Sequence, residues 1–256
     1  MPRILILGLV AGLIAGLLVG GFHNIFTVPV LERAIDFEEA QAALAAPNAP
    51  DEDALVSLGT QRWGMAIGTG IYGAVLGIVF AAGFTVLRRA APNWKPLALA
   101  VTVSILGFWA LSLFPFIRYP LSPPGVGDPD TLTYRQVLQT LFMILSVLGV
   151  GVALFAIRAI NEKAQETGSR LQMYGGVALV YLVFNVIMYL AHPANPDPVP
   201  VPIDLLQLFQ ALTMVGQFLI WALMAGGVVV GLHWHQRRDK KAGNLYDPVT
   251  GAPARA

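Results

Sequence analysis

Cysteine is absent from the 256-residue sequence, and this absence removes whole classes of chemistry. A chain without thiols forms no disulfides, uses no cysteine nucleophile, and builds no thiolate zinc site or iron–sulfur cluster. Any metal ion must therefore be held by imidazole, oxygen or thioether ligands.

Charge is also scarce. Charged residues make up 12% of the chain, whereas an ordinary soluble domain carries roughly 25%. Apolar residues make up 56%, and the formal net charge is only +1. No basic patch is interleaved with aromatic residues, so the sequence predicts no nucleic-acid partner. The composition is typical of an integral membrane protein whose main partner is the lipid bilayer.

The motifs of several enzyme classes are missing as well. The sequence contains no H-E-x-x-H, no G-x-x-x-x-G-K-[ST] and no G-x-S-x-G pattern. No Asp, Glu, Lys or Arg lies in the middle of a long apolar run, which argues against a proton pump built on a carboxylate relay. We therefore do not expect an enzyme. Asn185 and Gln217 are the deepest strongly polar residues, and we expect each to make an interhelical hydrogen bond.

What the sequence does contain is six apolar runs of the length that a membrane span needs, about 20 residues. They predict an all-α integral membrane protein with a six-helix bundle. Arg3 and the first run resemble a signal peptide, but no A-x-A-like cleavage site follows, so we expect an uncleaved first helix. We expect one membrane domain over 1–236 and a short, disordered basic tail over 237–256. The predicted helices cover about 4–24, 64–87, 97–116, 137–157, 171–190 and 205–232.

Positive charge is distributed unevenly between the two sides of this bundle. Twelve of the sixteen Lys and Arg residues lie on the side of the N-terminus, and eleven of the fifteen acids lie opposite. Because basic residues are retained in the cytoplasm, both termini are predicted to be cytoplasmic. The outer face then carries the loops 25–63, 117–136 and 191–204. We expect a multi-pass protein of a bacterial inner membrane.

Glycine recurs every four residues in the first predicted helix, at Gly8, Gly12, Gly16 and Gly20. Such a repeat forms a groove without side chains, in which another helix can approach closely. Two interpretations stay open. The groove packs against the second predicted helix, which is also rich in glycine, or it docks a separate single-helix partner. We favour packing within the chain.

Two histidines lie at outer ends of predicted helices: His23 follows the first helix and His192 follows the fifth. Imidazole is the commonest metal ligand near neutral pH, and Co²⁺ or Ni²⁺ binds well to imidazole with carboxylate oxygen. Glu32 and Asp36 supply nearby carboxylates. These four residues are candidate metal ligands. The plainer alternative is that each histidine is an interfacial residue at a helix end.

The loop between the third and fourth predicted helices is rich in proline and charge. Its prolines fix φ and favour extended geometry, so we expect a stiff strap over residues 117–129. Asp128 suits a helix N-cap and Pro129 suits the first helical position. Arg135 is predicted to face back toward Asp128, and Arg118 to pair with Asp128 or Asp130.

Two roles for the strap stay open. It forms a rigid wall that presents Tyr119, Asp128 and Asp130 at the mouth of the bundle, or it is a tight cover that fixes the helices on either side. The residues assigned to the strap and its flanks are Arg118, Tyr119, Pro120, Pro123, Pro124, Asp128, Asp130 and Arg135.

The segment FPFIRYPLSPPGVGDPDTLTYR resembles the proline-rich signature of the CbtA family, whose members are predicted cobalt-transporter subunits. The segments PVLERAIDFEEA and GTQRWGMAIGTGIYGAVLGIVFAAGF agree with this family in order and spacing, as do Gln217 and Trp221. The resemblance extends to about residue 235. Its characteristic positions are Arg118, Tyr119, Pro120, Pro123, Pro124, Gly127, Asp128, Pro129, Thr131 and Arg135.

The resemblance implies the uptake of cobalt, linked to cobalamin synthesis. The divalent cation is then transported cargo and not a permanently bound cofactor, with Co²⁺ favoured and Ni²⁺ as the alternative. It also implies a small single-helix partner of the CbtB type, and an oligomer is compatible with it. The alternative function is a structural subunit that scaffolds a membrane complex without transporting an ion.

Overall fold

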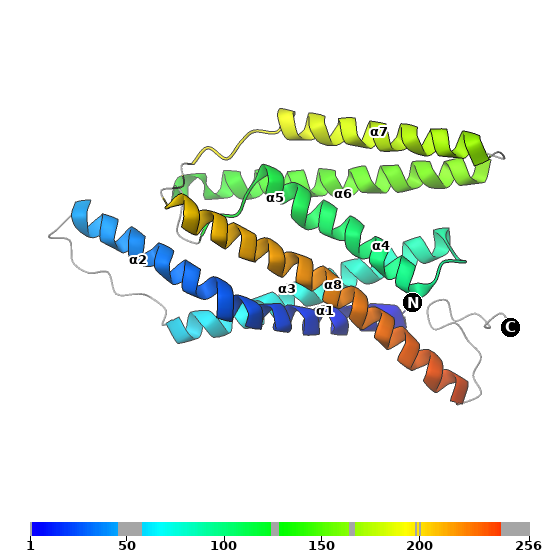
Figure 1. Cartoon of the computed structure of the whole chain (residues 1–256), viewed down its shortest axis with the longest axis horizontal. Coiled ribbons are helices and arrows are strands. Elements are labelled where there is room, and N and C mark those ends of the chain that lie inside the picture. The colour runs from blue at the N-terminus through cyan, green and yellow to red at the C-terminus, as the bar shows by residue number, and fades with distance from the viewer. Residues whose placement is uncertain are drawn as a thin grey trace. The chain divides into compact units, whose positions relative to one another are not determined.

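The computed structural model describes residues 2–45, 58–123, 128–163, 167–197, 199 and 201–241. These residues form helices and short connections, with no strand among them (Figure 1). Six of the helical segments are long and apolar enough to cross a membrane. The predicted all-α class with six spans is confirmed.

The helices are longer than the apolar runs that predicted them, because polar residues extend them at both ends. Two segments, η1 and η2, are π-helical, and η3 is a 3₁₀ turn. The elements are α1 Pro2–Phe22, η1 His23–Thr27, α2 Val28–Ala45, α3 Leu58–Ala90, α4 Pro96–Phe108, η2 Trp109–Leu113, α5 Phe114–Arg118, η3 Pro129–Thr131, α6 Leu132–Lys163, α7 Thr167–Ala191 and α8 Ile203–Lys241.

The prediction of an outer loop over 25–63 is wrong for residues 25–45 and 58–63, which are helical. Residues 28–45 are rich in Ala, Leu and Glu, which are strong helix formers, so their charges did not break the helix. The predicted disordered tail is likewise wrong for its first residues, because α8 continues to Lys241. Residues 242–256 lie outside the described part of the chain.

Both π-helical segments end two residues before a proline. In η1 the N–H of Val28 bonds the carbonyl of His23, and Pro29 follows. In η2 the N–H of Phe114 bonds the carbonyl of Trp109, and Pro115 follows. A proline inside a helix clashes with the carbonyl four residues earlier and donates no N–H. A wider turn before the proline accommodates this clash, so each helix bends but continues.

The chain divides into two compact units: unit 1 is residues 1–105 with 201–256, and unit 2 is residues 106–200. In unit 1, α1 packs against both α3 and α8. The Ser104 hydroxyl donates to the Trp221 carbonyl at 2.9 Å and so ties α4 to α8. Trp221, Phe80 and Phe84 are among the fully buried side chains of this unit.

The glycine groove of α1 is occupied by α3. A Cβ added at Gly12 would lie 2.1 Å from the Gly73 carbonyl oxygen, and one added at Gly73 would lie 2.3 Å from the Gly12 carbonyl oxygen. One added at Gly77 would lie 2.0 Å from the Gly8 carbonyl oxygen. The two backbones therefore touch, at a distance that admits weak Cα–H···O contacts. The docking of a separate helix in this groove is excluded by α3 itself.

In unit 2, the long helices α6 and α7 run side by side (Figure 1). A Cβ on Gly149 of α6 would lie 2.4 Å from the Phe184 ring of α7. Near the start of α6, one buried apolar cluster joins α5, the residue after it, α6 and α7. It consists of Phe114, Tyr119, Leu138, Phe142 and Met188, with Trp109 and Phe184 packed against it.

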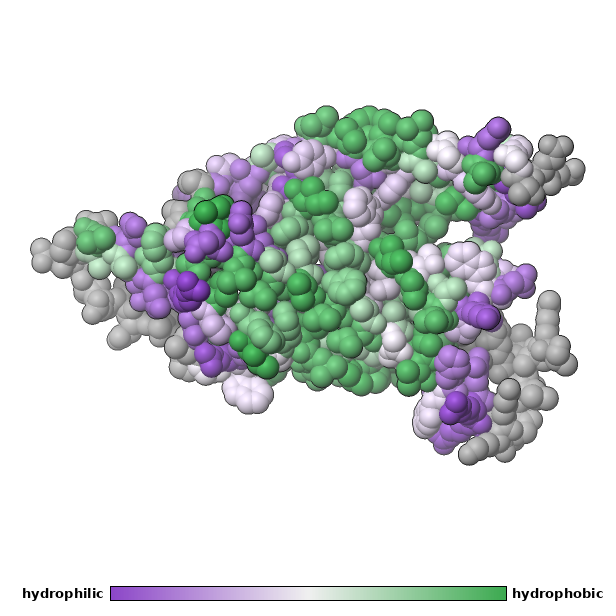
Figure 2. All heavy atoms as spheres, viewed as in Figure 1, coloured by the Kyte–Doolittle hydropathy of each residue, from purple (hydrophilic) through white to green (hydrophobic). Residues whose placement is uncertain are grey.

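Many large apolar side chains face outward, as expected of helices that lie in lipid. On α7, Leu179, Val180 and Leu190 are 61%, 70% and 74% exposed. Figure 2 shows apolar residues along the middle stretches of the helices on the visible face, with hydrophilic residues toward helix ends. This distribution fits an integral membrane protein, because lipid replaces water around the middle of each span.

Candidate functional site

Arg118 and Tyr119 fasten the start of the strap to the loop that follows α7. The Arg118 Nη2 group donates to the carbonyl oxygen of His192, and its guanidinium lies 5.1 Å from the centre of the Tyr189 ring. The Tyr119 hydroxyl donates to the Pro193 carbonyl oxygen at 2.6 Å. The predicted pairing of Arg118 with Asp128 or Asp130 is wrong, because a backbone carbonyl takes that place.

Tyr119 is buried, with only 8% of its surface exposed, and its ring meets the Phe142 ring edge-on at 5.7 Å. Burial raises the pKa of the Tyr119 phenol, so the group stays a neutral hydrogen-bond donor. The prediction that the strap presents Tyr119 at an open mouth is therefore wrong. Asp128 and Asp130 are exposed, as that interpretation required.

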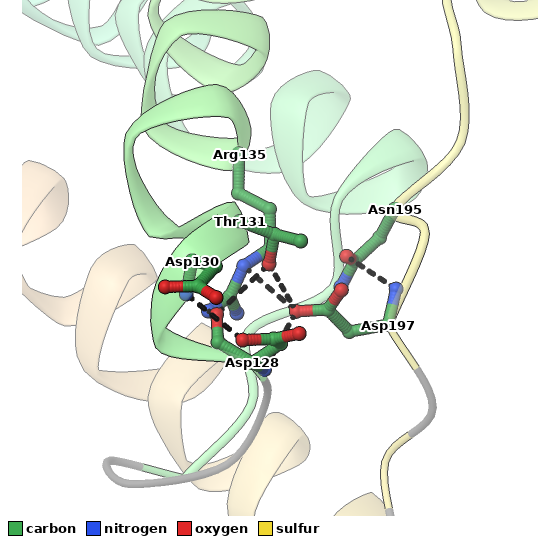
Figure 3. A network of polar contacts seen from close by, with 6 residues as sticks. All are labelled: Asp128, Asp130, Thr131, Arg135, Asn195 and Asp197. Carbon is green, nitrogen blue, oxygen red and sulfur yellow. Dashed lines mark hydrogen bonds and ion pairs between the residues drawn. The ribbon is translucent and has the colours of Figure 1, made fainter.

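The far end of the strap is held by a carboxylate that the sequence did not single out. Asp197 Oδ2 accepts the backbone N–H of Asp128 at 3.0 Å and the Thr131 hydroxyl at 2.6 Å. The same oxygen forms an ion pair with Arg135 Nε at 3.1 Å, and the Asp197 side chain is only 6% exposed. Figure 3 shows these side chains converging between α6 and the loop after α7. We call Asp128, Thr131, Arg135 and Asp197 the strap latch.

Local hydrogen bonds order the strap latch from within. Asp128 Oδ1 accepts the N–H of Asp130 at 2.9 Å, which confirms the predicted N-cap, and Pro129 begins η3. Arg135 Nη2 donates to the Asp128 carbonyl at 3.2 Å, as its predicted orientation required. Asn195 Oδ1 accepts the N–H of Asp197 at 3.2 Å and fixes the loop on the other side.

The strap prolines differ in their surroundings. Pro120 is exposed and Pro123 is buried. Residues 119–123 have no regular structure, whereas 117 and 118 belong to α5, so the non-helical part of the strap begins later than predicted. Pro124 and Gly127 lie outside the described residues.

His192 lies in the aromatic surroundings of this site. Its ring is 5.2 Å from the Phe142 ring and 6.2 Å from the Tyr119 ring, centre to centre. Its Nε2 atom is buried and has no hydrogen-bond partner within the part of the chain that the structure describes. His192 is thus a packed side chain of unit 2 with one ring nitrogen unused.

His23 is held in a different way, within η1 of unit 1. Its Nδ1 atom lies 2.8 Å from the hydroxyl of Thr27, a residue that is only 4% exposed. The imidazole lies directly on Gly216 of α8: a Cβ added there would be 2.4 Å from His23 Nε2 and Cε1. The hydrogen bond and the glycine surface together fix the orientation of the ring.

Gly216→Ala is expected to displace the His23 ring and lower the free energy of unfolding by about 1–2 kcal/mol, since overpacking forces side chains from their rotamers. Denaturant unfolding in detergent measures this. Because the penalty arises from the ring, it should vanish in the double variant Gly216→Ala with His23→Ala. Gly226→Ala, on the same helix with nothing within 4 Å, is the matched control. Equal penalties with and without His23 would contradict the contact.

The two predicted carboxylate ligands, Glu32 and Asp36, both lie on α2. Glu32 Oε1 forms an ion pair with Arg62 Nη2 at 2.7 Å, and Asp36 is exposed. In the described residues, no three His, Asp or Glu side chains are grouped so that they could hold a metal ion. His23, Glu32 and Asp36 belong to unit 1 and His192 to unit 2, so their common site stays a prediction.

Comparison with known proteins supports the resemblance that the strap sequence indicated. The model of the CbtA family, described as a probable cobalt transporter subunit, matches residues 1–235. No curated protein and no solved structure matches the chain. The match covers five of the potential spans completely, the sixth up to residue 235, and also the strap and the strap latch. The chain therefore belongs to the CbtA family of probable cobalt transporter subunits.

Proposed function

We propose that the chain is the membrane subunit of an importer that takes up Co²⁺ for cobalamin synthesis. The observation that carries this proposal is the family match over residues 1–235, which includes five of the six potential spans and nearly all of the sixth. The uneven distribution of Lys and Arg favours a bacterial inner membrane with both termini in the cytoplasm. Ni²⁺ has the same ligand preferences and is the competing cargo.

His23 is the best-supported metal contact among the four proposed. A histidine that binds a metal through one ring nitrogen usually has the other fixed by a hydrogen bond, and Thr27 occupies that position at His23 Nδ1. His192, Glu32 and Asp36 remain proposed contacts. Glu32 can bind a metal ion only after its ion pair with Arg62 is broken. A site with few metal ligands suits transport, because it binds the ion weakly enough for the ion to leave again.

The importer needs a partner as well as this chain. The sequence has no nucleotide-binding motif, so the energy for uptake comes from another subunit or from an ion gradient. We propose a small single-helix subunit of the CbtB type as one partner. Since α3 fills the glycine groove of α1, such a helix docks on another lipid-facing surface.

Uptake of radioactive Co²⁺ in cells that lack other cobalt importers tests this function. Cells that produce this chain with its partner should accumulate cobalt, and His23→Ala should reduce uptake at least tenfold at unchanged protein level. The matched control is His233→Ala, because His233 is an exposed histidine near the end of α8 whose ring nitrogen bonds the Val229 carbonyl of its own helix.

The outcomes separate the two functions. Unchanged uptake after deletion of the chain, with no growth defect at low cobalt, would overturn the proposal. Co-purification in a large complex that moves no metal would instead support a structural subunit. Competition of labelled Co²⁺ with unlabelled Ni²⁺ decides which ion is the preferred cargo.

A further inference from the structure

Helices α6 and α7 of unit 2 each carry buried residues along one face. On α6 the buried residues recur every four positions, whereas the residues between them are largely exposed. They are Leu138, Phe142, Ser146 and Val150, with exposures of 7%, 0%, 0% and 9%. On α7, Asn185 and Met188 are each 6% exposed. We call the contact between these two faces the seam.

Three polar atoms along the seam are buried and make no hydrogen bond to any described residue: Ser146 Oγ, Asn185 Oδ1 and His192 Nε2. The Asn185 amide nitrogen bonds the Tyr181 carbonyl of its own helix at 2.6 Å, so the predicted interhelical hydrogen bond does not form. Gln217, by contrast, accepts the Tyr72 hydroxyl from another helix at 3.2 Å, as predicted. A buried polar atom without a partner costs about 1–3 kcal/mol.

The register of the two helices places Ser146 and Asn185 at nearly the same depth. Phe142 meets His192, and Gly149 meets Phe184. This pairing puts Ser146 opposite the residues just before Met188, so Asn185 is offset by less than one turn, or about 4 Å along the helix axis. Phe142 and Ser146 are one turn apart on the same face, so the three polar atoms follow one another along the seam.

The chemistry of the two oxygens is complementary to water. The Ser146 hydroxyl has a hydrogen to donate, and Asn185 Oδ1 has lone pairs to accept one. A water molecule accepts from the serine and donates to the amide oxygen, which removes both penalties at once. The groups are neutral, and the Arg118 guanidinium bonds the backbone of His192 at the end of the seam.

We propose that Ser146 and Asn185 bind a water molecule, and that the seam is hydrated from His192 to Asn185. Resting on the proposed function, this hydration supplies the polar surroundings that a hydrated cation needs between the strap and the middle of the bundle. The site is independent of the four proposed metal contacts except His192. A direct Ser146–Asn185 hydrogen bond without water is the competing arrangement.

Radiolytic hydroxyl-radical footprinting of the intact protein in nanodiscs tests the water site, because bound water yields radicals that oxidise adjacent side chains. Met188 lies on the seam next to Asn185 and is 6% exposed; Met224 of unit 1 is 0% exposed and is the matched control. The absence of cysteine removes the most reactive competing group. Met188 is expected to form sulfoxide at least tenfold faster than Met224.

A double variant assigns that signal to the two oxygens. Ser146→Ala with Asn185→Leu replaces both polar groups by apolar ones, a change that is often close to neutral for stability. Oxidation of Met188 should then fall to the rate of Met224. Equal rates for the two methionines in the unaltered protein would overturn the water site, as would a fast Met188 rate that the double variant leaves unchanged.

The footprinting result and the cobalt-uptake result can contradict the water site and the proposed function separately. A hydrated seam in a protein that moves no cobalt leaves the water site standing and removes the proposed function. Normal cobalt uptake, with Met188 oxidised no faster than Met224, would support the proposed function and overturn the water site, because the seam would then hold no water. If the double variant does not accumulate, Ser146→Ala alone is used, and the expected fall in Met188 oxidation is then at least threefold.

Discussion

Replacement of Gly77 by alanine is expected to lower the free energy of unfolding by about 3 kcal/mol, the largest effect of a single methyl group that we expect in this chain. The new Cβ would lie 2.0 Å from the Gly8 carbonyl oxygen and 2.7 Å from the Gly8 carbonyl carbon. Neither atom can move without the α1 backbone. The two helices must therefore separate, and the backbone contacts on either side are lost with them.

The membrane makes this loss more serious than in water. Between helices in lipid there is no hydrophobic driving force, so close packing and weak Cα–H···O contacts supply most of the association free energy. The contacts are reciprocal: Gly12 meets Gly73, and Gly8 meets Gly77. Alanine is favoured over glycine inside a helix by about 1 kcal/mol, so the packing penalty must exceed this gain to be seen.

Gly68→Ala is the matched control, because Gly68 lies on the same helix with nothing within 4 Å of an added Cβ. It should leave stability unchanged or raise it by up to about 1 kcal/mol. Unfolding in mixed detergent micelles, followed by circular dichroism, measures both variants. If Gly77→Ala and Gly68→Ala behave alike, the close approach of α1 and α3 is not what stabilises unit 1.

The six spans could be predicted because each depends on a local property, an apolar run of sufficient length. The helix over 28–45 could not be predicted in this way, because its charges resemble those of a loop. The prolines supply a sequence signal for it. Pro29 and Pro115 each lie two residues after the end of a π-helical segment, and in both places the helix bends and continues past the proline.

The strap could be predicted in its local parts and not in its long-range ones. The N-cap at Asp128 follows from residues next to one another, and the structure has it. The partner of Arg118 is a backbone carbonyl 74 positions away, and every residue carries a carbonyl, so no residue type marks it. Gly216 gave no signal either, since glycine in an apolar helix usually indicates helix packing rather than a surface for an imidazole.

Asp197 is the position where sequence reasoning missed most, and its replacement should have the second large effect. Asp197→Ala removes the acceptor shared by the Asp128 N–H, the Thr131 hydroxyl and Arg135. Arg135 then keeps a largely buried charge without its carboxylate, which is costly. We expect the strap latch to open more easily by about 2 kcal/mol, equivalent to roughly 30-fold faster hydrogen exchange at the Asp128 amide.

Asp130→Asn separates this effect from the mere loss of a negative charge near the strap. Asp130 is exposed, and its backbone N–H, not its carboxylate, bonds Asp128. Exchange at the Asp128 amide should therefore stay within about twofold of the unaltered protein, because an exposed charge contributes little. Asp197→Asn should fall between the two variants, since an amide oxygen still accepts two of the three contacts but cannot pair with Arg135. If Asp197→Ala and Asp130→Asn exchange equally fast, Asp197 does not hold the far end of the strap, and the contacts of Arg118 and Tyr119 with the carbonyls after α7 must hold the strap alone.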